Sequence, residues 1–153
     1  MIHLSALAGY ARLAPRLASD LRSALRRLDR SAAELSVVLV GDRRMRTLNL
    51  RTRRIDRTTD VLSFPAARTP GSRLLGDLVI CVPLARRRAT ALGRTLRAEL
   101  RLYAIHGLLH LLGHDHLSPR DRRRMAQAEQ QLLGETGLIA RAEPQAEVED
   151  RSA

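Results

Sequence analysis

The sequence contains no lysine and no tryptophan, and among its 153 residues only Tyr10, Phe64 and Tyr103 are aromatic. Arginine therefore carries all of the basic side-chain charge, and the formal net charge is +11. Because guanidinium groups bind phosphate through paired hydrogen bonds, we expect a phosphate-rich partner, with nucleic acid ahead of an anionic membrane surface. So few aromatic side chains argue against a protein that reads single strands by stacking bases on aromatic rings.

Cysteine and long apolar runs are equally scarce. The single cysteine, Cys81, excludes an intramolecular disulfide and lies in an apolar run, so we expect a small core side chain in a protein of a reducing compartment. No segment approaches the roughly 20 apolar residues that a membrane-spanning helix requires. These absences predict a cytoplasmic protein with no membrane partner.

Apolar periodicity predicts a single α+β domain, in which helices cover a small mixed β-sheet. A broad apolar face over residues 95–113 predicts a central helix. Asp42 is expected to be the N-cap of the second helix. The other expected helices cover residues 15–29, 42–53, 84–93 and 118–137, and the expected strands cover residues 34–41, 60–65 and 75–83, with MIHLS at residues 1–5 as a further short strand.

The stretch HGLLHLLGHDH contains four of the five histidines. His106 and His110 are four residues apart on the expected central helix, so their side chains lie on one face, one turn apart. Gly113 is expected to end this helix in a left-handed conformation, after which the chain can return a third imidazole from either His114 or His116. We favour His116, because its interval of ten residues from His106 allows one turnaround, and we place His114 along the wall of the site.

Three histidines with an open fourth position are typical of a catalytic zinc site. This spacing matches that of the metzincin proteases, in which a glutamate directly after the first histidine is the general base. Gly107 occupies that position here, so ordinary zinc-protease catalysis is disfavoured and the general base is unassigned. A zinc-bound water can still supply hydroxide. We therefore expect residues 1–140 to form one metal-dependent hydrolase domain, followed by a disordered acidic tail at residues 141–153.

A second motif, LNLRTRRIDRTTDVLSFP, joins an expected helix to an expected strand through charged residues. Composition favours a solvated connection in which these charges offset one another. The alternative is a phosphate-binding loop beside the metal, in which Arg51, Arg54 and Arg57 contact RNA.

Four motifs in this order, LN…R..D..TDVLSFP, LGDLVI, HGLLHLLGHDH and M…E, resemble those of the YbeY family of bacterial metal-dependent endoribonucleases and rRNA maturation factors. The resemblance extends from about Glu34 to Leu133 and implies an α+β fold. It also implies a functional arginine, which matches Arg53, and one zinc-type ion held by His106, His110 and His116.

The resemblance further implies a single-strand-specific endoribonuclease that acts in small-subunit rRNA 3′-end maturation and in ribosome quality control. Its implied partners are RNA, above all rRNA, and the small ribosomal subunit with its assembly factors. In the expected mechanism the metal activates water or a 2′-hydroxyl, and Arg53 neutralises charge that develops on the phosphate. The carboxylate of Asp60, Asp77 or Asp115 would orient a histidine through its second ring nitrogen. A zinc peptidase and a non-catalytic ribosome-assembly module with a structural metal are the alternatives.

Overall fold

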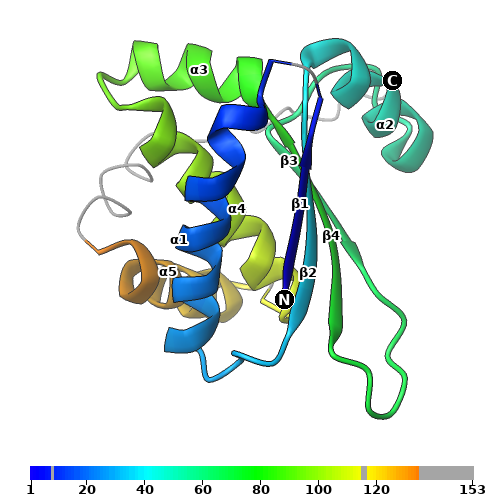
Figure 1. Cartoon of the computed structure of the whole chain (residues 1–153), viewed down its shortest axis with the longest axis vertical. Helices are drawn as coiled ribbons and strands as arrows, with labels where there is room; N and C mark the ends of the chain where they lie inside the picture. The colour runs from blue at the N-terminus through cyan, green and yellow to red at the C-terminus, as the bar shows by residue number, and fades with distance from the viewer. Residues whose placement is uncertain (8, 115–116, 135–153) are drawn as a thin grey trace.

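A four-stranded mixed sheet forms the centre of the computed structural model, which describes residues 1–7, 9–114 and 117–134 (Figure 1). The strand order is β1-β2-β4-β3; β1, β2 and β4 are parallel, and β3 is antiparallel to β4. The expected strands are confirmed, including the short first one, and their bounds are β1 Ile2–Ala6, β2 Glu34–Val40, β3 Val61–Pro65 and β4 Leu74–Cys81.

Helices cover the two faces of the sheet unequally. In Figure 1, α1, α3, α4 and α5 lie on one side of the sheet and α2 lies on the other. No helix in the described ranges is long and apolar enough to cross a membrane. The helix bounds are α1 Ala14–Arg27, α2 Asp42–Arg53, α3 Val82–Ala91, α4 Leu96–Leu111 and α5 Pro119–Leu133, with a short 3-10 turn at Ala11–Leu13.

The central helix predicted from the broad apolar face is α4. It packs among α1, α3, α5 and the sheet, and side chains from around its circumference are buried, as at Leu100, Ile105 and Leu108. Its start is fixed by Thr95, whose hydroxyl oxygen accepts a hydrogen bond from the Ala98 amide at 3.1 Å. The helix that carries the histidines is thus held by the main hydrophobic core.

At Gly107, α4 lies close against β3 and β4. A Cβ atom at this position would lie 2.8 Å from Leu78 Cδ2 on β4 and 3.1 Å from Val61 Cγ2 on β3. The Ser63 hydroxyl of β3 also donates a hydrogen bond to the Gly107 carbonyl, at 3.3 Å. A larger residue would force these side chains or the helix to shift, so the absence of a side chain at residue 107 allows the histidine helix to lie close against β3 and β4.

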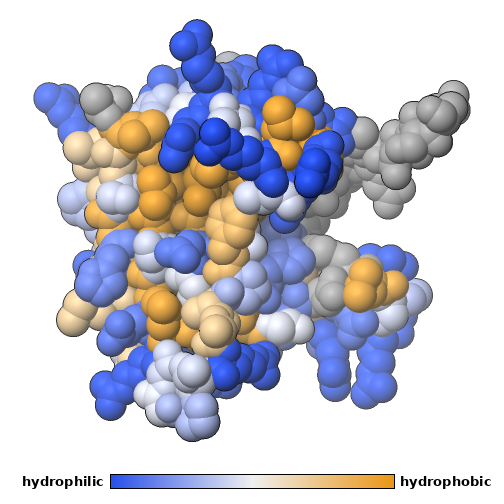
Figure 2. All heavy atoms as spheres, turned by 90° about the vertical axis from the view of Figure 1, so that its right-hand side faces the viewer, coloured by the Kyte–Doolittle hydropathy of each residue, from blue (hydrophilic) through white to orange (hydrophobic). Residues whose placement is uncertain are grey.

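The opposite face of the sheet carries a smaller core beneath α2, in which Met45 packs with Val40, Leu62, Val79 and Cys81. Cys81 is fully buried, which confirms the prediction of a small core side chain. Burial also raises the pKa of its thiol. Seen from this side, hydrophilic side chains gather over α2 at the top of the molecule, and apolar side chains are visible over the sheet below it (Figure 2).

The expected cap of α2 is wrong by one residue. The N-cap is Gly41, and Asp42 is the first residue of the helix. The Asp42 carboxylate instead forms two hydrogen bonds of 2.8 Å with the Arg87 guanidinium of α3. This pairing lowers the pKa of the Asp42 carboxyl and ties α2 to α3.

Candidate metal and phosphate-binding site

A pocket of about 470 Å³ lies where the end of α2, the beginning of β3 and the end of α4 meet. It brings together the two motifs that the sequence separates by some fifty residues, because Arg53 and the histidines of α4 share its wall. The lining residues are Arg53, Thr59, Asp60, Val61, Ser63, Pro65, His106, His110, Gly113 and His114.

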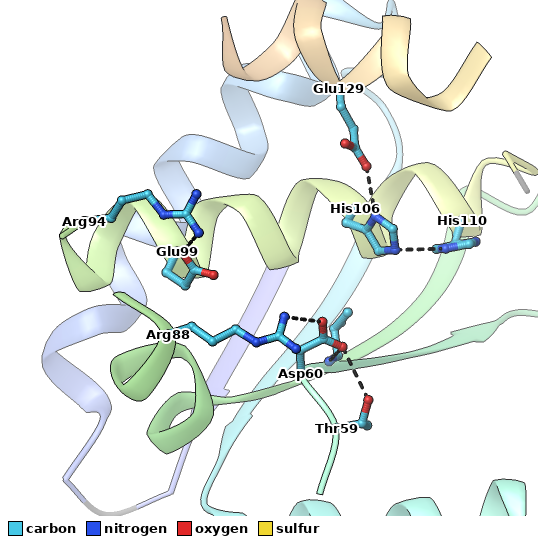
Figure 3. Close-up of polar contacts among 9 residues, drawn as sticks. Thr59, Asp60, Arg88, Arg94, Glu99, His106, His110 and Glu129 are labelled. Atoms are coloured by element: carbon cyan, nitrogen blue, oxygen red, sulfur yellow. Dashed lines mark hydrogen bonds and ion pairs between the residues drawn. The ribbon is translucent and has the colours of Figure 1, made fainter. Parts of the chain in front are cut away.

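The rings of His106 and His110 converge, as their spacing of one helical turn predicts. Their Nε2 atoms are 3.1 Å apart, and the planes of the two rings are inclined at 76°. Figure 3 shows both side chains extending from the same side of α4, with Nε2 of each ring directed toward the other.

Glu129 of α5 orients His106. This role was not predicted from the sequence, because only aspartates were expected to orient a histidine. Its Oε1 lies 2.8 Å from His106 Nδ1, and the glutamate is only 1% exposed. Figure 3 shows the carboxylate reaching down from α5 onto the imidazole. The signal in the sequence was the spacing of Met125, Glu129 and Leu132, which places a charged residue on the apolar face of α5.

The hydrogen bond from His106 to Glu129 determines which ring nitrogen of His106 is available to a ligand in the pocket. A carboxylate can only accept, so Nδ1 of His106 carries the hydrogen and Nε2 presents its lone pair to His110. Two imidazole nitrogens 3.1 Å apart then need a proton or a cation between them. Two nitrogens bound to one tetrahedral zinc ion would lie about 3.3 Å apart, so these side chains fit two positions of such a site.

The third expected ligand, His116, lies outside the described residues, as does Asp115. Gly113 has φ +95°, as predicted for a helix-ending glycine, and His114 follows it on the wall of the pocket. Within residues 1–7, 9–114 and 117–134, no three side chains of the histidine, cysteine, aspartate or glutamate types are grouped so that they could hold a metal ion. Of the three expected metal ligands, the structure therefore describes only the pair His106 and His110.

Arg53 is the last residue of α2, and the loop that follows it is anchored to that helix. Arg54 ends the helix in a left-handed conformation with φ 62°. The buried Asn49 side chain donates a hydrogen bond of 2.9 Å to the Arg57 carbonyl. This bond holds the loop against α2, and it assigns a physical role to the asparagine of the LN motif.

The other arginines of this motif, and Asp56, lie outside the pocket lining. Arg51, Arg54 and Arg57 are exposed and do not line the pocket. Asp56 pairs through both carboxylate oxygens with Arg46 of α2, which lowers the pKa of the Asp56 carboxyl.

Of the expected orienting aspartates, Asp60 lines the pocket and Asp77 does not. Asp60 Oδ1 accepts a hydrogen bond from the Val61 amide at 2.7 Å, and Oδ2 lies 3.5 Å from Arg88 Nη1 (Figure 3). Asp60 is thereby fixed at the start of β3. Asp77 is an exposed residue of β4, next to Leu78, which lies under α4.

Comparisons with known proteins agree on one family. A family model described as endoribonuclease YbeY matches residues 10–137. The endoribonuclease YbeY of Myxococcus xanthus is 54% identical over 123 residues, which cover 78% of this chain and 42% of that protein. The Anaeromyxobacter dehalogenans protein of the same name is 50% identical over 133 residues, which cover 86% of this chain and 69% of that protein. The endoribonuclease YbeY of Mycolicibacterium smegmatis is 38% identical over 145 residues, which cover 88% of this chain and 82% of that protein.

The solution structure of TM1509 from Thermotoga maritima matches over the full length of both chains, with a TM-score of 0.67 and 24% sequence identity, and so shares the fold. Fold and pocket together define a class, a small α+β domain with paired imidazoles beside an arginine. The chain belongs to the YbeY endoribonuclease family. The expected fold class and the resemblance carried by the four motifs are thereby confirmed.

Proposed function

We propose that the protein is a single-strand-specific endoribonuclease whose active centre is the pocket of His106, His110 and Arg53, with His116 as the third ligand of a zinc ion. The observation that carries this proposal is the meeting of two features in one pocket. A pair of imidazole nitrogens lies 3.1 Å apart, and the same wall contains a guanidinium group. Such an arrangement suits a phosphodiester, whose transition state gathers negative charge on oxygen.

Each described side chain then has a definite task. A zinc-type ion at the histidines supplies Lewis acidity and makes water more acidic. Glu129 keeps the His106 ring in the orientation and tautomer that present Nε2 to the pocket. Arg53 binds the phosphate and stabilises the charge that grows on it. The main-chain hydrogen bond to Asp60 and the hydrogen bond from Ser63 to α4 keep β3 in place beside the histidines.

The structure adds a second argument against a peptidase. At residue 107 a side chain would meet Leu78, Val61 and Ser63 of the sheet, so the position that carries the general base in metzincins is closed by packing. A nuclease also has to take a proton from the attacking water or 2′-hydroxyl, and the base for that step is unassigned; Arg53 would act separately, on the charge that develops on phosphate.

We extend the proposal to rRNA as the substrate, namely small-subunit 3′-end maturation and ribosome quality control in the cytoplasm, together with the small subunit and its assembly factors. Membership of the YbeY family supports this extension. The net charge of +11 is compatible with a ribonucleoprotein partner.

The test measures cleavage of single-stranded RNA and of casein by the zinc-loaded protein. Wild type should cleave RNA only, and Arg53→Ala should lose about 10²–10³ in kcat while its zinc content is unchanged. Arg44→Ala is the matched control, because Arg44 is exposed on the same helix and does not line the pocket. His110→Ala should abolish cleavage and leave a folded protein, whereas a structural metal would make the same change unfold it. Cleavage of casein alone, or full RNase activity in Arg53→Ala, would contradict the proposal.

A further inference from the structure

A second pocket, of about 390 Å³, adjoins the histidine pocket beneath the loop between β3 and β4. The two pockets share Pro65, His110 and Gly113 in their walls. One of the shared residues, His110, belongs to the converging histidine pair. An extended ligand that passes the histidines can therefore continue directly into the second pocket.

The lining of this second pocket combines positive charge with apolar surface. Arg30 comes from the connection after α1 and Arg68 from the β3–β4 loop, so two distant segments each contribute a guanidinium group. Of the side chains that the structure describes in this lining, none is acidic. Among the described residues, neither arginine forms an ion pair, in contrast to the arginines at positions 46, 87, 88, 94 and 97. The apolar part of the lining consists of Leu74, Leu75, Leu111 and Leu112, with Ala66 and Ala67.

A third pocket, of about 420 Å³, also meets the site, and its chemistry is different. It shares Gly113 and His114 with the histidine pocket. Asp121 lines it beside Arg124, so a carboxylate offsets the guanidinium charge. A polyanion is therefore better accommodated in the pocket of Arg30 and Arg68.

We propose that the pocket of Arg30 and Arg68 is a subsite for the nucleotide adjacent to the cleaved bond of a single-stranded RNA. The two guanidinium groups bind backbone phosphate, and the leucine and alanine side chains contact the sugar and base. Among the described residues, no tyrosine, phenylalanine or tryptophan lines the pocket, so the subsite grips the backbone with little preference for sequence. This inference rests on the proposed function, because it assigns a further part of the same substrate.

The test is the salt dependence of binding to a fluorescent single-stranded 2′-O-methyl RNA of about ten nucleotides, a length within the usual range of single-strand binding sites. Each phosphate contact that is lost reduces the slope of log K against log salt by about 0.7. We expect this reduction in zinc-loaded Arg30→Gln and again in Arg68→Gln, measured by fluorescence anisotropy on oligonucleotide shown to be intact. Arg16→Gln is the charge-matched control, because Arg16 is exposed in the first turn of α1, at the opposite end of that helix from Arg30.

The subsite is supported if both pocket variants lose slope and the control does not. It is overturned if either pocket variant keeps the wild-type slope, or if the control loses as much as they do. Cleavage of unmodified RNA by wild type, measured in parallel, separates this inference from the proposed function. Cleavage with unchanged slopes refutes the subsite alone, whereas loss of slope without any cleavage of RNA by wild type refutes the proposed function.

Discussion

Replacing Glu129 with glutamine tests whether the buried carboxylate prepares His106 to bind metal. The change keeps the size of the side chain and removes its charge, so the packing of α5 on α4 is preserved. The glutamine oxygen can still accept a hydrogen bond from His106 Nδ1, the atom that lies 2.8 Å from Glu129 Oε1. What is lost is the charge assistance of that hydrogen bond, which makes such a bond roughly twice as strong as a neutral one.

The expected loss is a weakening of zinc affinity by about 10-fold to 100-fold, the usual effect of removing a residue that orients a metal ligand. This corresponds to about 1.4–2.7 kcal/mol of binding free energy. Because Glu129→Gln retains an acceptor, it should fall near the lower value, and Glu129→Leu, which retains none, near the upper. The order of the two variants is itself part of the prediction.

Zinc affinity is measured by competition with a chromophoric chelator at fixed pH, and urea unfolding of the metal-free proteins checks that each variant is folded. Glu99→Gln is the matched control. Glu99 lies on α4, is 1% exposed like Glu129, and pairs with Arg94 at 2.8 Å (Figure 3). It is seven residues before His106, about 10 Å along the helix, so its loss should lower the free energy of unfolding and leave zinc affinity unchanged. Wild-type zinc affinity in both Glu129 variants, or an equal loss in Glu99→Gln, would refute the reasoning.

Two further changes test the packing and the charges near the site. Gly107→Ala gains about 1 kcal/mol of helix propensity, but it places a methyl group 2.8 Å from Leu78 Cδ2, and such overpacking costs about 1–3 kcal/mol. Urea titration should therefore show a lower free energy of unfolding than in wild type. A higher free energy of unfolding would contradict the close approach of α4 to the sheet. Arg87→Ala removes the guanidinium that lowers the pKa of the Asp42 carboxyl, and because both side chains are about half exposed the loss at neutral pH should be about 0.2–1 kcal/mol. Because the pKa of the Asp42 carboxyl is lowered in the folded state, this stabilisation is present above the ordinary aspartate pKa of about 3.9 and is lost as pH falls through the folded-state value. If the free energies of unfolding of variant and wild type still differed as much at about pH 2, Asp42 could not be the source of the difference.

Local patterns were sufficient for the elements themselves. The wide apolar face of residues 95–113 identified α4 as central, and its four-residue histidine spacing was enough to predict converging rings. Ser118, with proline directly after it, begins α5 as an N-cap residue should, and its hydroxyl accepts a hydrogen bond from the Asp121 amide at 3.1 Å. Such features depend on residues within one or two turns of each other, which is why the sequence expresses them directly.

Contacts between distant elements could not be read in this way. Three aspartates were candidates to orient a histidine because they lie in or near the motifs, yet the partner of His106 is Glu129 on another helix. Nothing local specifies that α5 crosses α4 with this face inward; the signals were a charged residue in an apolar row and the M…E motif that contains it. In the same way, the order β1-β2-β4-β3 depends on the crossovers and not on any single strand.

Gly107 links the fold to the chemistry more closely than the sequence suggested. From sequence it marked a missing general base next to an expected metal ligand. In the structure it is also the contact that seats α4 on β3 and β4, with Ser63 bonded to its carbonyl. The close approach brings His106 and His110 to the wall that Asp60 and Ser63 share, and there Arg53 can meet them. A glutamate at residue 107 would start from a Cβ crowded by Leu78, Val61 and Ser63. In the proposed mechanism the group that stabilises charge on phosphate comes from another element, the end of α2, where Arg53 lines the same pocket.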